Sequence, residues 1–248
     1  MAFAVRFRIA TEKEKIESVA RLVKASTGDF DFYLFAVLGV TMASLGLALD
    51  SPEVIIGSML IAPVLYPFLS LALALVLSDL TLAYRSVRTL FTSIITSIGL
   101  SFLLAFVLSL FVGVDTNGQI LARAEPSVLY FIIAFVSGIA ATYSLVHANL
   151  NETLPGVAIS VSLVPPLAAV GVALALLNTS IAIGALVLFL VNAVGILLAS
   201  MVTFTLMDVH STHKVVSSAI SQEEKRLADE QQQIKEIVHE AAEHKNHG

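Results

Sequence analysis

The chain has 248 residues, of which 57% are hydrophobic and only 13% are charged, and its mean hydropathy is +0.89. Soluble domains carry about 25% charged residues, so this composition predicts a protein whose outer surface faces lipid. The net charge of −5 comes without a basic patch interleaved with aromatic residues, which argues against a nucleic-acid partner, and the absence of cysteine excludes disulfides and thiolate metal sites.

The first segment, residues 1–29, is polar and contains one predicted amphipathic helix at 11–26. Apolar side chains recur on one side of this helix, and charged residues occupy the other positions. Thr11 is followed three residues later by Glu14, which is the spacing of a capping box at a helix N-terminus. We expect this segment to lie in the cytoplasm.

Six apolar stretches follow, each long enough to cross about 30 Å of hydrocarbon at about 1.5 Å per residue. Their ranges are 30–49, 54–78, 90–113, 127–146, 155–177 and 180–207. The sequence therefore predicts an all-α, polytopic membrane protein with a six-helix transmembrane domain at 30–207. The tail, 208–248, is expected to be helical and cytoplasmic.

Lysine and arginine are distributed unevenly along the chain. Six spans put residues 1–29, the link after the second span and the tail on one side of the membrane. These segments hold six, two and five of the 14 basic residues, and only Arg123 lies opposite. Because basic residues mark the cytoplasmic side, we expect a plasma-membrane protein with both termini in the cytoplasm.

The two halves of the transmembrane domain resemble each other. Residues 36–47 align with 134–145, and each segment precedes a proline-containing helix and then an unbroken helix. Three spans per half insert the second half upside down. We therefore expect two inverted repeats, 30–113 and 127–207, which is the plan of many secondary transporters.

Prolines interrupt the second and fifth spans near mid-length. They are Pro63 and Pro67 in the second span, and Pro165 and Pro166 in the fifth. A proline has no N–H and clashes with the carbonyl four residues back, so four carbonyls should be freed, those of Met59, Pro63, Val161 and Ser162. Two such breaks that face each other would form a site for a small ion or polar solute, whereas two plain kinks patched by serine are the alternative.

The candidate site therefore consists of the prolines and the small, hydroxyl-bearing or amide residues near them. Its members are Gly57, Ser58, Met59, Pro63, Pro67, Ser160, Val161, Ser162, Pro165, Pro166 and Asn192. The Asn192 amide could serve an interhelical hydrogen bond or a substrate contact. No charged residue is predicted deep in a span, so we expect no proton relay, metal or cofactor, and a monovalent ion or neutral polar solute as ligand.

Two periodic patterns predict contacts between helices. Small residues recur every four positions in the third span at Ser93, Ser97, Ser101, Ala105 and Ser109, which favours close packing within the bundle or between subunits over pore lining. Apolar residues recur every seven positions in the tail at Ile220, Leu227, Ile234 and Ala241, which fits a coiled-coil seam or a solvated amphipathic helix. Together they predict a homo-oligomer, most simply a homodimer.

The two proline motifs carry a family resemblance. The segments Ile56-Gly-Ser-Met-Leu-Ile-Ala-Pro63 and Leu154-Pro-Gly-Val-Ala-Ile-Ser-Val-Ser-Leu-Val-Pro-Pro166 resemble those of DUF389, a family of prokaryotic membrane proteins with an uncharacterised hydrophobic domain. The resemblance covers roughly residues 30–206. It implies a six-span membrane domain and gives no substrate.

Three classes of function can be compared on these observations. The sequence has no nucleophile paired with a base and no metal frame, so a membrane enzyme is not expected. The leading hypothesis is a transporter or channel with its site at the paired breaks. The alternative is a scaffold or sensor that acts through its cytoplasmic helices. A water-accessible cavity reaching Pro63 and Pro165 would favour transport, and a fully packed midplane would favour the scaffold.

Overall fold

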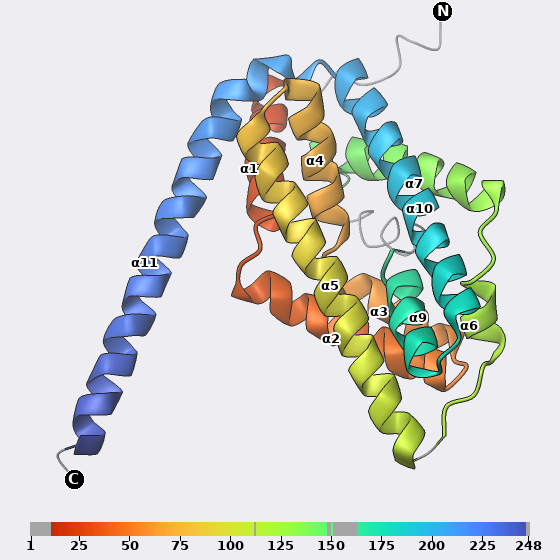
Figure 1. Cartoon of the computed structure of the whole chain (residues 1–248). Coiled ribbons are helices and arrows are strands. Elements are labelled where there is room, and N and C mark those ends of the chain that lie inside the picture. The colour runs from red at the N-terminus through yellow and green to blue at the C-terminus, as the bar shows by residue number, and fades with distance from the viewer. Residues whose placement is uncertain (1–10, 112, 148–149, 151–162, 247–248) are drawn as a thin grey trace, which may run out of the picture.

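The computed structural model describes residues 11–111, 113–147, 150 and 163–246. Every regular element in these ranges is a helix (Figure 1). The helices are α1 (Glu12–Ala25), α2 (Phe30–Ala48), α3 (Pro52–Ile61), α4 (Leu65–Leu77), α5 (Leu80–Phe111), α6 (Gly118–Ala122), α7 (Val128–Val146), α9 (Val164–Ala175), α10 (Thr179–Leu206), the short 3₁₀ helix η3 (Val209–Thr212) and α11 (His213–Asn246).

Four of these helices, α2, α5, α7 and α10, are long and apolar enough to cross a membrane. The consecutive helices α3 and α4 bend by 49° at their junction and bring the number to five if they form one span. The predicted fifth span is described only from residue 163 onward, where α9 supplies 12 apolar residues. The described residues therefore have the helices of a multi-pass membrane protein.

Several helices differ in extent from the prediction. The third span was expected from residue 90, but α5 begins at Leu80 because its polar first turns continue the helix beyond the apolar stretch. Arg85 in these turns pairs with Glu224 of α11 at 2.9 Å. The tail, expected to be helical within 208–248, forms the helix α11 from His213 onward. Hydropathy marks the apolar part of a helix, whereas backbone hydrogen bonding sets its ends.

Helix α1 covers one end of the bundle and does not stand apart from it. The predicted capping box of Thr11 and Glu14 is confirmed. From the buried face of α1, Lys15 Nζ donates to the carbonyl of Asp208 at 2.9 Å, and Ser18 Oγ lies within hydrogen-bonding distance of the carbonyls of Glu14, at 2.6 Å, and Val146, at 3.0 Å. These contacts join α1 to the turn after α10 and to the last residue of α7, whose carbonyl has no partner within its own helix.

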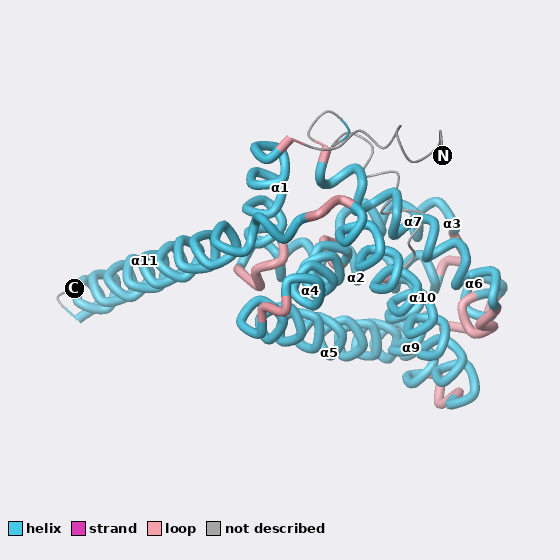
Figure 2. Tube along the Cα trace, turned by 90° about the horizontal axis from the view of Figure 1, so that it is seen from above, coloured by secondary structure: helices cyan, strands magenta, loops and turns pink. Residues whose placement is uncertain are grey.

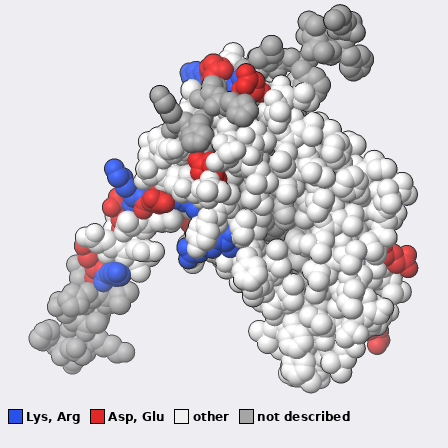
Figure 3. All heavy atoms as spheres, turned by 45° about the horizontal axis from the view of Figure 1, so that its top comes forward, with Lys and Arg blue, Asp and Glu red and all other residues white. Residues whose placement is uncertain are grey.

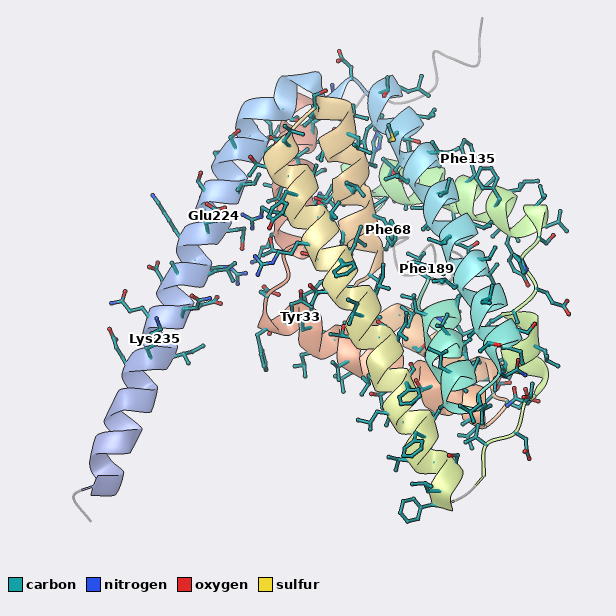
Figure 4. The ribbon with its side chains drawn as sticks, viewed as in Figure 1. Tyr33, Phe68, Phe135, Phe189, Glu224 and Lys235 are labelled. Atoms are coloured by element: carbon teal, nitrogen blue, oxygen red, sulfur yellow. The ribbon has the colours of Figure 1, made fainter. Side chains whose placement is uncertain are left out.

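The centre of the bundle has a reciprocal arrangement. Helices α4 and α9 each pack against both α5 and α10, while α2 packs against α5 and α7 packs against α10 (Figures 1 and 2). The rings of Phe68 and Phe189 meet edge to face between α4 and α10, with centroids 6.1 Å apart (Figure 4). The two halves of the chain thus interlock through α4 and α9.

The predicted small-residue stripe of α5 packs within this bundle. Four of its five members, Ser93, Ser97, Ser101 and Ala105, are buried, whereas Ser109 is partly exposed. Ser101 Oγ lies 2.7 Å from Ser44 Oγ of α2. Gly171 of α9 comes so close to α5 that an added Cβ would lie 2.5 Å from the Ile98 carbonyl oxygen. Small side chains permit this close crossing of α5 by its neighbours.

Charged side chains gather at one end of the molecule. In Figure 3 they cluster where α1 and α11 meet the bundle, and most of the rest of the visible face carries none. From this end α11 extends away from the other helices (Figures 1 and 2). Two ion pairs join its first half to the bundle, Arg85–Glu224 at 2.9 Å and Asp29–Arg226 at 2.8 Å. We refer to this part of the molecule as the charged end.

Candidate functional site

The break between α3 and α4 follows directly from the sequence around Pro63. Helix α3 ends at Ile61, and Ala62 adopts an extended backbone with φ −76° and ψ 122°. Proline disfavours the helical conformation in the residue before it and cannot donate a backbone hydrogen bond itself. Helix α4 then starts at Leu65 in a direction 49° away from that of α3.

The prediction that Pro67 frees the carbonyl of Pro63 is wrong. Pro67 lies in the first turn of α4, where a helix leaves its N–H groups without intrahelical partners, so this proline disturbs no ladder. The carbonyl of Pro63 is not freed, because it accepts a hydrogen bond from the amide of Tyr66 at 3.3 Å. The interruption is therefore a single break at Pro63.

The polar group predicted beside this break is buried. Ser58 is fully buried and donates its hydroxyl to the carbonyl of Ile55 at 2.6 Å, so its oxygen keeps acceptor capacity. Met59 is also buried, whereas Gly57 is partly exposed and lies beside the end of the Met42 side chain. The α3 side of the break thus offers one buried hydroxyl oxygen.

The second proline pair begins a helix. Pro165 and Pro166 are buried in the first turn of α9, which starts at Val164. The candidate residues Ser160, Val161 and Ser162 lie outside the described residues. Helix α9 is also in contact with α3, so the structure brings the helices of the two proline motifs together.

Helix α10 carries two buried polar side chains. Asn192 is 2% exposed, and its side chain or backbone interacts with another group of the protein. Ser200 Oγ, two turns further along, is buried and has no hydrogen-bond partner within the described residues. Sequence reasoning missed Ser200, because a single serine in an apolar helix usually bonds to the carbonyl one turn back. An unpartnered buried hydroxyl needs an explanation, and neither Ser200 nor Asn192 lines the cavity described below.

A cavity of about 380 Å³ reaches the break from the charged end. Pro63, Ile61 and Tyr66 form its wall at the break. The opposite wall comes from the end of α1, the link to α2 and the first turns of α2, with Lys24, Asp29, Asp31, Phe32 and Phe35. Sequence reasoning did not find this cavity, because no pattern in the sequence relates the three segments that build it, which are the end of α1, the start of α2 and the break between α3 and α4. Pro165 is not among its lining residues.

The carboxylates and cations at this cavity are not equivalent. Asp29 Oδ1 accepts from the amide of Phe32 at 2.9 Å and so caps α2, and its Oδ2 binds Arg226 Nη2 at 2.8 Å. Hydrogen bonding to Asp29 raises the pKa of the Arg226 guanidinium above its ordinary value. Lys24 and Asp31 are exposed and have no partner within the described part of the chain. Two unpaired, opposite charges therefore border the cavity.

The described residues define a helical protein of the multi-pass membrane class, with four or five helices able to span and one sharp break at a proline. Residues 59–198 match the family described as "Domain of unknown function (DUF389)", and the chain belongs to this family. An uncharacterised protein of Methanocaldococcus jannaschii is 34% identical over 172 residues, which are 69% of this chain and 52% of that protein. The chain thus spans about half the length of this curated relative. No solved structure matches the chain.

Proposed function

We propose that the protein is a transporter or channel for a small monovalent ion or neutral polar solute, with its site at the helix breaks. The observation that carries the proposal is the cavity of about 380 Å³ that reaches Pro63 and so meets the first half of the criterion stated above, while Pro165 and Ser58 are not among its lining residues. A helix break that lines a cavity is a recurrent feature of transporters, because irregular backbone in a membrane must be covered by protein or water.

The arrangement of the helices supports the six-span inverted repeat in this proposal. A two-fold relation that exchanges α2 with α7, α4 with α9 and α5 with α10 is obeyed by the packing of α4 and α9 on both α5 and α10, and by α2 on α5 and α7 on α10. It is not obeyed by α2 on α9, because α7 has no comparable packing on α4 within the described residues. In such folds the site lies between the repeats, near the bilayer midplane.

Orientation and assembly are part of the same proposal. We infer a plasma-membrane location with the charged end in the cytoplasm, because 13 of the 14 basic residues lie in segments that six spans put on that side. We also propose a homodimer, since symmetric assembly is common and the exposed part of α11 could pair with a second copy. Transport, and not catalysis, is the activity proposed.

Liposome reconstitution tests the transport proposal. Ion-flux and solute-uptake rates of the wild type are compared with those of Pro63→Ala plus Pro165→Ala and of Ser58→Ala plus Ser160→Ala. We expect at least a tenfold loss of rate, or a change of selectivity, in both double variants. Pro52→Ala is the matched control, because Pro52 occupies the first turn of α3, where it breaks nothing. Full activity in both double variants would move the site elsewhere.

A scaffold or sensor remains the second candidate because of one feature. Helix α11 has 34 residues and extends away from the bundle, and its described side chains beyond Leu227 are exposed (Figures 1 and 2). Such a helix could recruit a partner protein. Absence of flux under every gradient tried, with a folded protein in the liposomes, would favour this candidate.

A further inference from the structure

The cavity at the charged end holds two charges that the protein itself leaves unpaired. Lys24 comes from the last turn of α1 and Asp31 from the first turn of α2, and both line the cavity. Neither forms a hydrogen bond or ion pair within the described ranges. By contrast, Asp29 is fully engaged by Phe32 and Arg226. One ammonium and one carboxylate are therefore available to a ligand.

The rest of the wall is apolar and aromatic. Phe35 of α2 and Tyr66 of α4 line the space together with Ile61 and Pro63 at the break and the largely buried Phe32, and the cavity is open to the surface. Aromatic faces attract organic cations, and an adjacent carboxylate adds to that attraction. The volume of about 380 Å³ falls within the range of small-molecule sites, which is about 300–1,000 Å³.

Charge complementarity narrows the chemistry of the ligand. A simple anion would neutralise Lys24 and leave Asp31 unpaired, and a simple cation would do the reverse. A divalent metal prefers several oxygen ligands, but Asp29 is occupied and Lys24 would repel the ion. A molecule that carries both an ammonium and an anionic group can pair with both side chains at once.

We propose that this cavity is a binding site for a zwitterion, with its ammonium at Asp31 and the aromatic rings and its carboxylate or phosphate at Lys24. Two sources share this chemistry, a free solute and the headgroup of a zwitterionic phospholipid. If the zwitterion is a free solute, it is the net-neutral polar substrate of the proposed transporter, and this case rests on the proposed transport function. The headgroup case does not. As a headgroup it would be a bound lipid at the charged end.

Binding to the purified full chain in a non-ionic maltoside detergent tests the proposal. Thermal-shift titrations use glycine betaine and glycerophosphoethanolamine as zwitterions, and tetramethylammonium and acetate as single-charge probes. Nanodiscs of phosphatidylethanolamine are compared with nanodiscs of phosphatidylglycerol. We expect a zwitterion to bind at least tenfold more tightly than either single-charge probe. Stabilisation by the free compounds identifies a solute, and stabilisation only in phosphatidylethanolamine nanodiscs identifies a headgroup.

Charge variants locate the binding to the cavity. Lys24→Gln and Asp31→Asn should each weaken zwitterion binding at least tenfold, and the exchange Lys24→Asp plus Asp31→Lys should recover part of it. The matched controls Lys13→Gln and Glu53→Gln remove exposed charges that do not line the cavity.

Three results would overturn the zwitterion site. These are equal affinity for zwitterions and single-charge probes, binding unchanged in both single variants, and no stabilisation in any arm. The probe comparison needs only the wild type, so poorly folding variants do not prevent a decision. Flux without zwitterion binding would refute this inference alone, and binding without flux would refute the transport function alone.

Discussion

Arg226 and Asp29 join the tail helix to the start of the first long apolar helix. Nη2 of Arg226 lies 2.8 Å from Oδ2 of Asp29, across 197 positions of sequence. The other carboxylate oxygen of Asp29 caps α2 through the amide of Phe32. The same side chain also lines the cavity that reaches Pro63. One carboxylate therefore links the tail, the start of α2 and the candidate site.

Arg226→Gln should loosen the docking of α11. The pair is partly exposed, with 33% of the Arg226 side chain and 14% of the Asp29 side chain accessible, so we expect a loss of about 1 kcal/mol. Hydrogen–deuterium exchange in the first half of α11 should accelerate about fivefold. Lys235→Gln removes an exposed charge of the same helix (labelled in Figure 4) and should leave exchange unchanged. Unchanged exchange in Arg226→Gln would mean that other contacts hold the tail.

Gly171→Ala should destabilise the crossing of α9 and α5. The new Cβ would lie 2.5 Å from the Ile98 carbonyl oxygen and 2.7 Å from the Phe102 backbone nitrogen, and backbone atoms cannot move aside easily. Overpacking of this kind costs about 1–3 kcal/mol. Thermal unfolding in detergent should show a lower midpoint.

Gly99→Ala in α5 is the control for that experiment. No atom lies within 4 Å of a Cβ built there, and alanine favours helix, so its midpoint should be unchanged or higher. Equal midpoints for Gly171→Ala and Gly99→Ala would show that α5 and α9 can separate without cost.

The helical character and the main break could be predicted because each depends on local chemistry. An apolar run of sufficient length predicts a helix that can span, and α2, α7 and α10 begin within one residue of the expected starts. A proline inside a helix predicts a break because it lacks an N–H, and Pro63 is such a proline. Pro67 misled the prediction, because its effect depends on where α4 begins, and that start is set by Pro63 itself.

The cavity could not be predicted because tertiary packing creates it. Lys24 and Asp31 read as ordinary charged residues at helix ends, and nothing in their spacing relates them to Tyr66. Only the fold brings the ends of α1 and α2 to the break between α3 and α4. The same holds for Arg226, whose sequence neighbours are other tail residues and whose partner Asp29 lies at the opposite end of the chain.

The hydroxyl groups of Ser44 and Ser101 should stabilise the fold jointly, with a small coupling free energy of unfolding. Their hydroxyl oxygens lie 2.7 Å apart in the buried contact between α2 and α5. Hydrogen bonds between membrane helices contribute about 0.6 kcal/mol on average, because each hydroxyl can also bond within its own helix, as Ser44 does to Val40. A double-mutant cycle with Ser44→Ala and Ser101→Ala measures the coupling by unfolding in detergent. A coupling above about 2 kcal/mol would contradict this estimate.

The proposed six-span topology predicts opposite labelling of two exposed positions. The chain has no cysteine, so a single introduced cysteine is the only thiol. Thr116 lies in the link between α5 and α7, and Leu80, which is 85% exposed, starts α5 at the other end. With the charged end in the cytoplasm, an impermeant maleimide added to intact cells should label Thr116→Cys and not Leu80→Cys. After cell lysis both variants should be labelled, which controls for accessibility. Labelling of Leu80→Cys alone in intact cells would reverse the orientation, and with it the side from which the cavity opens.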